Sequence, residues 1–204
     1  MSTITRRAAG ALGLALVLAS STSFAQAPAP VRIRAAIDKV DGPTLMVTSR
    51  TGEALTIKLV GAGMVVALVK ASMTDIKPGS FVGITALPGE GVWRAIEVHI
   101  FPEAMRGTGE GDRPWDLAPQ STMTNATVSD IVAKVQGHTL TLKFKEGEKT
   151  FAITPETVIV TYVPGDKAEL KPGKKIFIPA AVKQPDGTYE AQRVNIGRDV
   201  DPPM

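Results

Sequence analysis

The feature that most constrains this chain is an internal duplication, because a repeated unit must adopt a fold that suits both of its copies. Three blocks recur in the same order: Ile37–Leu45 with Val132–Leu140, Ile76–Gly79 with Leu170–Gly173, and Trp93–Val98 with Tyr189–Val194. The spacing between partners shifts by only a residue or two from block to block, as short loop insertions produce. The sequence therefore predicts two copies of one small structural unit.

Each copy has the pattern of five short β-strands separated by turns. In the second copy, Thr139–Lys145 alternates apolar and polar residues, which is the period of a strand with one buried face. Turn signals separate the segments, such as Gln184-Pro185-Asp186-Gly187 and the Lys-Pro-Gly runs that begin at Lys77 and Lys171. Strands at this spacing predict small barrels or sandwiches. Five strands with a break after the third resemble the oligonucleotide/oligosaccharide-binding (OB) barrel.

The predicted fold class is therefore all-β, with two tandem small five-stranded OB-like barrels after a cleaved signal peptide. In the first copy, the segment from Gly63 to Ile76 is where we expect a short helix. The predicted boundaries are 1–25 for the signal peptide, 31–101 for the first barrel, 102–125 for a bridging strap, 126–197 for the second barrel and 198–204 for a tail.

The N-terminal segment has the parts of a secretory signal. Arg6 and Arg7 precede a short apolar run, and Ser23-Phe24-Ala25 offers small residues at the positions that a signal peptidase reads. We expect cleavage near Ala25 and a periplasmic mature protein. No later segment has the roughly 20 apolar residues of a membrane-spanning helix.

Charge and cysteine content exclude several classes of function. The chain has 23 Lys and Arg against 20 Asp and Glu, and loss of Arg6 and Arg7 leaves the mature part close to neutral. Nothing in this balance points to nucleic acid as a partner. The absence of cysteine excludes disulfides, thiolate metal sites and a cysteine nucleophile.

The segment 102–125 between the copies is long for a connection and is rich in glycine and proline. It also carries apolar side chains, including Met105 and Trp115, that are costly to leave in water. We expect an ordered strap that packs across one or both barrels and offers a contact surface for a ligand or a protein. The candidate binding residues are its charged cluster and its tryptophan: Arg106, Glu110, Asp112, Arg113, Trp115 and Asp116.

These residues also carry a resemblance. The repeat unit, the run Met105–Gly111, the Pro114-Trp115-Asp116-Leu117 motif and Ser121–Ala126 are similar to the exported bacterial family called domain of unknown function 5666. The subgroup that it resembles is often labelled "metal ABC transporter permease". The resemblance implies an exported β protein and no particular activity. It also implies histidine at the position of Asp112 in many relatives, so a metal-ligand role for that side chain is not carried over.

The sequence offers little catalytic chemistry. It contains no Gly-x-Ser-x-Gly elbow, and its histidines, His99 and His138, occupy non-equivalent places in the two copies. We therefore predict no catalytic residue, no metal ligand and no cofactor. The leading hypothesis is a non-catalytic periplasmic binding or accessory protein whose partner is an unknown periplasmic protein or small ligand. The alternatives are a metal-handling accessory of an ABC importer, an envelope hydrolase using strap carboxylates such as Glu103 and Glu110, and a purely structural envelope protein.

Overall fold

The computed structural model describes residues 28–134 and 137–202, so the predicted signal peptide lies outside the described residues, as do 203–204 of the tail. The prediction of an all-β fold is confirmed. The strands are β1 (Val31–Asp41), β2 (Thr44–Ser49), β3 (Ala54–Lys70), β4 (Phe81–Leu87), β5 (Trp93–Ile100), β6 (Gly111–Pro114), β7 (Thr122–Ala133), β8 (His138–Phe144), β9 (Gly147–Ile153), β10 (Val158–Pro164), β11 (Lys175–Lys183) and β12 (Tyr189–Gly197). Single 3-10 turns form η1 (Met73–Asp75), η2 (Glu103–Met105) and η3 (Lys167–Glu169).

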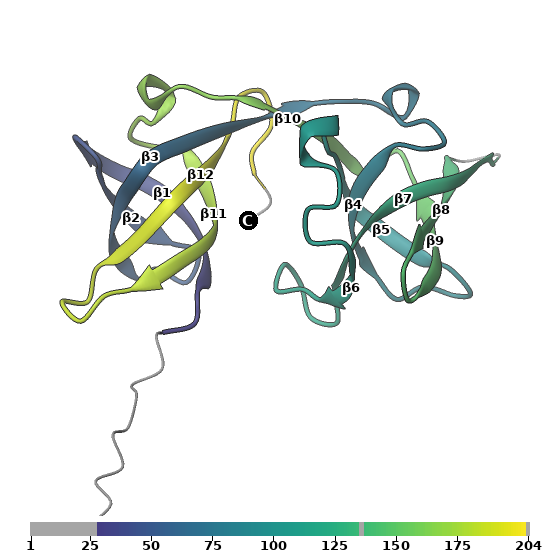
Figure 1. The fold of residues 1–204 in the computed structure, drawn as a ribbon, viewed down its shortest axis with the longest axis horizontal. Coiled ribbons are helices and arrows are strands. Elements are labelled where there is room, and N and C mark those ends of the chain that lie inside the picture. Colours follow the sequence, from purple (N-terminus) through teal and green to yellow (C-terminus); the bar gives the residue numbers. More distant parts are fainter. Residues whose placement is uncertain (1–27, 135–136, 203–204) are drawn as a thin grey trace, which may run out of the picture.

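The first barrel combines strands from both ends of the chain. Its order is β12-β11-β1-β2-β3, and β12 runs parallel to β3 and closes the ring (Figure 1). Residues at alternate positions, such as Ile33, Ala35 and Ile37 of β1, point inward with Ile176 and Ile178 of β11 to form one apolar core. The period-2 pattern of the sequence thus becomes the inner face of a closed five-stranded barrel.

The second barrel is built from the middle of the chain. Its strands follow the order β5-β4-β7-β8-β9, and β5 pairs in parallel with β9 at Trp93↔Phe151 and Arg94↔Ala152. Leu140 and Leu142 of β8, which the alternating pattern had placed on one face, are fully buried there with Phe151. Within the described residues this core is a separate apolar cluster from that of the first barrel.

The two halves of the sequence exchange their last strands. The sequence predicts that 31–101 and 126–197 each close a barrel, but β4 and β5 of the first half pair with β7 and β9 of the second. Conversely, β11 and β12 of the second half complete the ring of β1–β3. Because the two copies have matching strands, either final hairpin can complete either barrel, and the repeat pattern alone does not say which one it joins.

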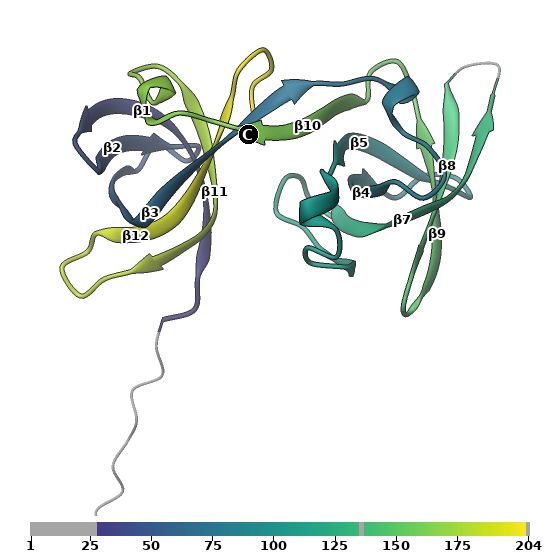
Figure 2. The same ribbon diagram turned by 45° about the horizontal axis from the view of Figure 1, so that its top comes forward.

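A pair of crossing strands carries this exchange. β3 continues past its own barrel and pairs antiparallel with β10, with Leu68 opposite Tyr162 at the centre of the register. Figures 1 and 2 show β3 and β10 running between the two barrels, and β10 also lies parallel to β5. The helix predicted between Gly63 and Ile76 is therefore mostly strand, and only η1 is helical.

Glycine allows β3 to bend after its pairing with β2 has ended and while it still pairs with β12. Gly61 and Gly63 have φ of 63° and 54°, in the left-handed region that other residues avoid. The register with β12 shifts between Ala191 and Arg193, opposite this part of β3. The local bulge bends the strand, so that its second half points toward the other barrel.

The matching Lys-Pro-Gly turns are present in both halves. Gly79 and Gly173 have φ of 88° and 83°, and Ser80 and Lys174 each donate a backbone hydrogen bond to the lysine carbonyl three residues earlier, at 2.9 and 3.1 Å. Proline fixes the second position of such a turn and glycine the third. Each turn feeds the strand pair that crosses to the other barrel.

Strand exchange predicts that the two halves stay associated after the chain is cut in the segment 102–125 that connects them. A protease site inserted between the exposed residues Gly107 and Thr108 should yield two fragments that co-elute at the size of the intact protein, since each fragment supplies strands to both barrels. Size-exclusion chromatography in 1 M NaCl, before and after cleavage, measures this. Fragments that separate without denaturant would show that each half closes its own barrel.

Candidate ligand pocket between the two barrels

The strap, residues 102–125, lies on the side of the second barrel that faces the first (Figure 1). It is held to the second barrel by pairing of β6 with β7 and by the side-chain amide of Asn125, which donates to the carbonyl of Thr108 at 2.8 Å. It reaches the first barrel through Asp116, which accepts a hydrogen bond from Arg34 at 2.7 Å. The strap therefore contacts both barrels and closes one side of the space between them.

Trp115 of the strap packs against the outside of the first barrel. Its ring lies 4.0 Å from the guanidinium carbon of Arg32 and meets Phe177 edge-on at a centroid distance of 6.5 Å. Arg50 of the first barrel adds hydrogen bonds to the backbone carbonyls of Asp116 and Leu117. Stacking of arginine on an indole face is favourable by about 0.5–1 kcal/mol at exposed sites.

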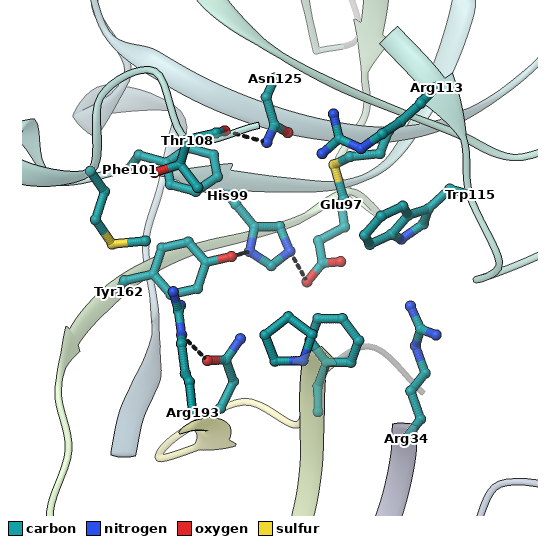
Figure 3. A pocket seen from close by; sticks show the side chains of 15 residues that line it. Arg34, Glu97, His99, Phe101, Thr108, Arg113, Trp115, Asn125, Tyr162 and Arg193 are labelled. Carbon is teal, nitrogen blue, oxygen red and sulfur yellow. Dashed lines mark hydrogen bonds and ion pairs between the residues drawn. The ribbon is translucent and has the colours of Figure 1, made fainter. Parts of the chain in front are cut away.

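Strap and barrels together line a partly open pocket of about 120 Å³. A single water molecule needs roughly 10–15 Å³ when volume is counted as the space open to a water-sized sphere. A pocket of this size therefore suits a small organic molecule. Figure 3 shows side chains from both barrels and from the strap converging on it. It is lined by Arg34, Glu97, His99, Phe101, Met105, Thr108, Arg113, Trp115, Met123, Asn125, Tyr162, Phe177, Pro179, Arg193 and Asn195.

A chain of three polar side chains crosses the pocket wall. The hydroxyl of Tyr162 lies 2.6 Å from Nδ1 of His99, and Nε2 of His99 lies 2.9 Å from Oε1 of Glu97 (Figure 3). Burial, together with the charge of Glu97, raises the pKa of Tyr162 far above its usual value, so the hydroxyl keeps its proton and can donate to His99. In the neutral tautomer that fits this arrangement, the imidazole proton is on Nε2 and faces Glu97.

This chain leaves polar atoms poorly satisfied. Glu97 and His99 are only 3% and 5% exposed, yet Oε2 of Glu97 has no hydrogen-bond partner within residues 28–134 and 137–202. The contact between His99 and Glu97 is close, but its direction does not meet hydrogen-bond geometry, so Nε2 is also without a well-formed bond. Most buried polar atoms of native proteins are paired, so such atoms mark a place that needs an explanation.

Arg113 and Arg193 place positive charge on the pocket from two elements. Arg193 of β12 donates to Oδ1 of Asn195 at 2.7 Å and lies over the ring of Tyr162, and Arg113 of β6 donates to the carbonyl of Gly109 at 2.6 Å. Burial lowers the pKa of both guanidinium groups. Neither arginine has a carboxylate within ion-pair distance in the part of the chain that the structure describes.

Arg34, a third arginine at the pocket, is 6% exposed and pairs with Asp116. Partial burial by itself raises the pKa of Asp116, but the hydrogen bond and charge of Arg34, with the charge of Arg32, outweigh it and lower that pKa. The pair joins β1 to the strap, so it holds the strap against the first barrel beside the pocket.

The pocket brings together residues that the duplication makes equivalent. Glu97 and His99 of β5 align with Arg193 and Asn195 of β12, and both pairs lie on the outward face of their strands. On an isolated barrel these positions would face water, which is why they are polar. In this protein the outward faces of β5 and β12 meet, so the polar residues become the lining of the pocket.

Of the six predicted site residues, Arg113 and Trp115 line this pocket. Asp116 lies beside it in a more open hollow of about 280 Å³ that Arg34 also lines. The other three lie elsewhere: Arg106 pairs with Glu103, Asp112 pairs with Lys149 of β9, and Glu110 is exposed. The sequence did not single out Glu97, His99, Tyr162 and Arg193 as binding residues, although polar residues at matching outward positions of both copies were a signal for three of them, Glu97, His99 and Arg193.

Residues 28–134 and 137–202 lack two further features. They form no group of three or more His, Cys, Asp or Glu side chains placed to hold a metal ion. They also include no helix with the length and apolar character needed to cross a membrane.

Comparison with known proteins returned no match to a family model, to a curated protein or to a solved structure. The site must therefore be interpreted from its own chemistry.

The Arg34–Asp116 pair predicts a specific pH dependence of stability. Because the folded pKa of Asp116 is depressed, its contribution is present above the unfolded value near 4 and is lost as pH falls through the folded value. Asp116→Asn should lower the free energy of unfolding by about 1 kcal/mol at pH 7, since the pair is partly exposed.

Urea denaturation from pH 7 to pH 3 measures this, and the gap between wild type and Asp116→Asn should shrink below about pH 4. Asp41→Asn, at an exposed residue of the first hairpin, is the control and should leave stability nearly unchanged. A gap that stays constant down to pH 3 would contradict the role given to the pair.

Proposed function

We propose that this chain is an exported, non-catalytic binding protein that holds a small ligand with an anionic group in the pocket between its barrels. The observation that carries the proposal is that Arg113 and Arg193 are half-buried at the pocket without a carboxylate partner among the described residues. Burial of an unpaired guanidinium is costly, and a bound anion would offset that cost with charge-assisted hydrogen bonds.

The remaining lining suits the body of such a ligand. Phe101 and Tyr162 have ring centroids 5.3 Å apart, and Trp115 and Phe177 form a second aromatic pair. Binding pockets for small molecules typically combine apolar and aromatic walls with a few placed polar groups. The aromatic pairs would contact the apolar part of the ligand while the arginines orient its charge.

The strand order supports assigning both barrels to the OB-like type. Each ring joins a three-strand meander to a hairpin from the other half, and its third strand runs parallel to the last strand of that hairpin. This is the layout expected of an OB-like barrel, so we propose two strand-exchanged OB-like barrels. Fold alone does not give a ligand, and the proposal therefore depends on the pocket rather than on the barrels.

Export to the periplasm is part of the proposal and depends on the signal-like segment before Gln26. A binding protein in that compartment acts as a carrier or sensor for small molecules that enter the envelope. The proposal assigns no reaction to the pocket.

The test is a screen of small organic anions, amino acids included, by thermal shift and then calorimetry on the purified protein. Binding of the best anion should weaken at least about tenfold in Arg193→Met, because a charge-assisted hydrogen bond contributes roughly 1.5–3 kcal/mol. A Trp93→Phe background leaves Trp115 as the fluorescent reporter at the pocket, since the chain has 2 tryptophans.

Arg106→Met is the matched control, because this exposed strap arginine already pairs with Glu103 and does not line the pocket. It should leave affinity unchanged. Equal weakening in both variants, or no anion that binds at millimolar concentration, would overturn the proposed function.

A further inference from the structure

We infer that the ligand carries an ammonium group as well as a carboxylate, and that the pocket takes a free amino acid. This inference rests on the proposed function and narrows the chemical class of its ligand. It depends on Glu97, an acidic residue in a pocket that three arginines also line.

Glu97 is an unusual residue for an anion-binding wall. It is 3% exposed and lines the pocket, and its Oε2 is buried without a hydrogen-bond partner among the described residues. Figure 3 shows the Glu97 carboxylate between His99 and Trp115, with one oxygen directed at His99 and the other turned away from it. That second oxygen therefore lacks a donor, and its carboxylate contributes negative charge beside the pocket.

His99 faces only Oε1 of this carboxylate, so it leaves Oε2 without a partner among the described residues. The Tyr162 hydroxyl contacts Nδ1 of the imidazole, so Nε2 is the ring nitrogen that faces Glu97. A buried carboxylate is costly unless it is paired and hydrogen-bonded. A ligand that brings positively charged N–H donors would satisfy it, whereas a simple anion would be repelled.

An ammonium group fits these surroundings. It presents three donors, so it can bond Oε2 of Glu97 and still lie against an aromatic face. Tyr162, Trp115 and Phe177 line the pocket, each with an arginine near one face of its ring, and an ammonium group would be attracted to the face that remains. The ligand carboxylate then has Arg193 or Arg113 available for paired hydrogen bonds.

The charges of the pocket agree with this assignment. Arg34 is balanced by Asp116, which leaves Arg113 and Arg193 against Glu97. A ligand ammonium opposite Glu97 would balance the negative charge, and a ligand carboxylate opposite one guanidinium would balance a positive charge. A second carboxylate, as in an acidic amino acid, would meet the remaining arginine.

Two matched ligand series test the inference by calorimetry on the purified protein. The first compares L-phenylalanine with 3-phenylpropanoate, which lacks the amine, and 2-phenylethylamine, which lacks the carboxylate. The second compares L-glutamate with glutarate, which lacks the amine, and propylamine, which lacks both carboxylates. In at least one series the amino acid should bind about tenfold or more tightly than either analogue, because each analogue leaves a buried charge unmet.

Glu97→Gln keeps the shape of the side chain and removes its charge, and it should reduce the preference for the amino acid over its deaminated analogue to less than about threefold. The comparison of ligands on the wild-type protein stands even if this variant does not fold. A deaminated acid that binds wild type as tightly as its amino acid, in both series, would overturn the inference and leave the proposed function intact. Failure of every ligand in both series and of the wider anion screen would overturn both.

Discussion

The antiparallel pairing of β3 with β10 is the constraint on which the rest of the structure depends. It carries the chain from the first barrel to the second and back, so that each barrel is completed by strands from the other half. Sequence-equivalent positions, Leu68 and Tyr162, face each other in its register. The same pairing sets the outward faces of β5 and β12 against one another, and Tyr162 itself lines the pocket that results. The β3–β10 crossing joins the two barrels both through the chain itself and through backbone hydrogen bonds.

The pocket forms because the outward faces of β5 and β12, which carry polar residues typical of a protein surface, are buried between the two barrels. Glu97, His99, Arg193 and Asn195 are polar because a single barrel would show them to water. The strand exchange and the strap remove that water, and the side chains pair only in part. A polar interface whose groups satisfy each other incompletely is unfavourable for stability alone, but it agrees with the binding site proposed above, in which a ligand would supply the missing partners.

The strap determines how that site is closed. It begins and ends in the second barrel, yet Asp116 and Trp115 anchor it to β1 and β11 of the first. Arg113 reaches the pocket from the same segment. One stretch of chain therefore supplies a wall of the pocket, one of its charges and the contacts that hold the barrels together, which explains its apolar content despite its many glycines and prolines.

The duplication and the alternation of apolar residues determined, from sequence alone, the all-β class, the inner faces of the strands and the paired Lys-Pro-Gly turns, because these depend on local periodicity and backbone preference. The sequence also pointed to Arg113 and Trp115. It could not decide which hairpin completes which barrel, since equivalent strands make nearly equivalent pairings and only the path of β3 and β10 separates them. For the same reason the sequence did not show that Glu97 and His99 line one pocket with Tyr162 and Arg193, because residues far apart in the chain meet only once both barrels and the crossing between them have formed.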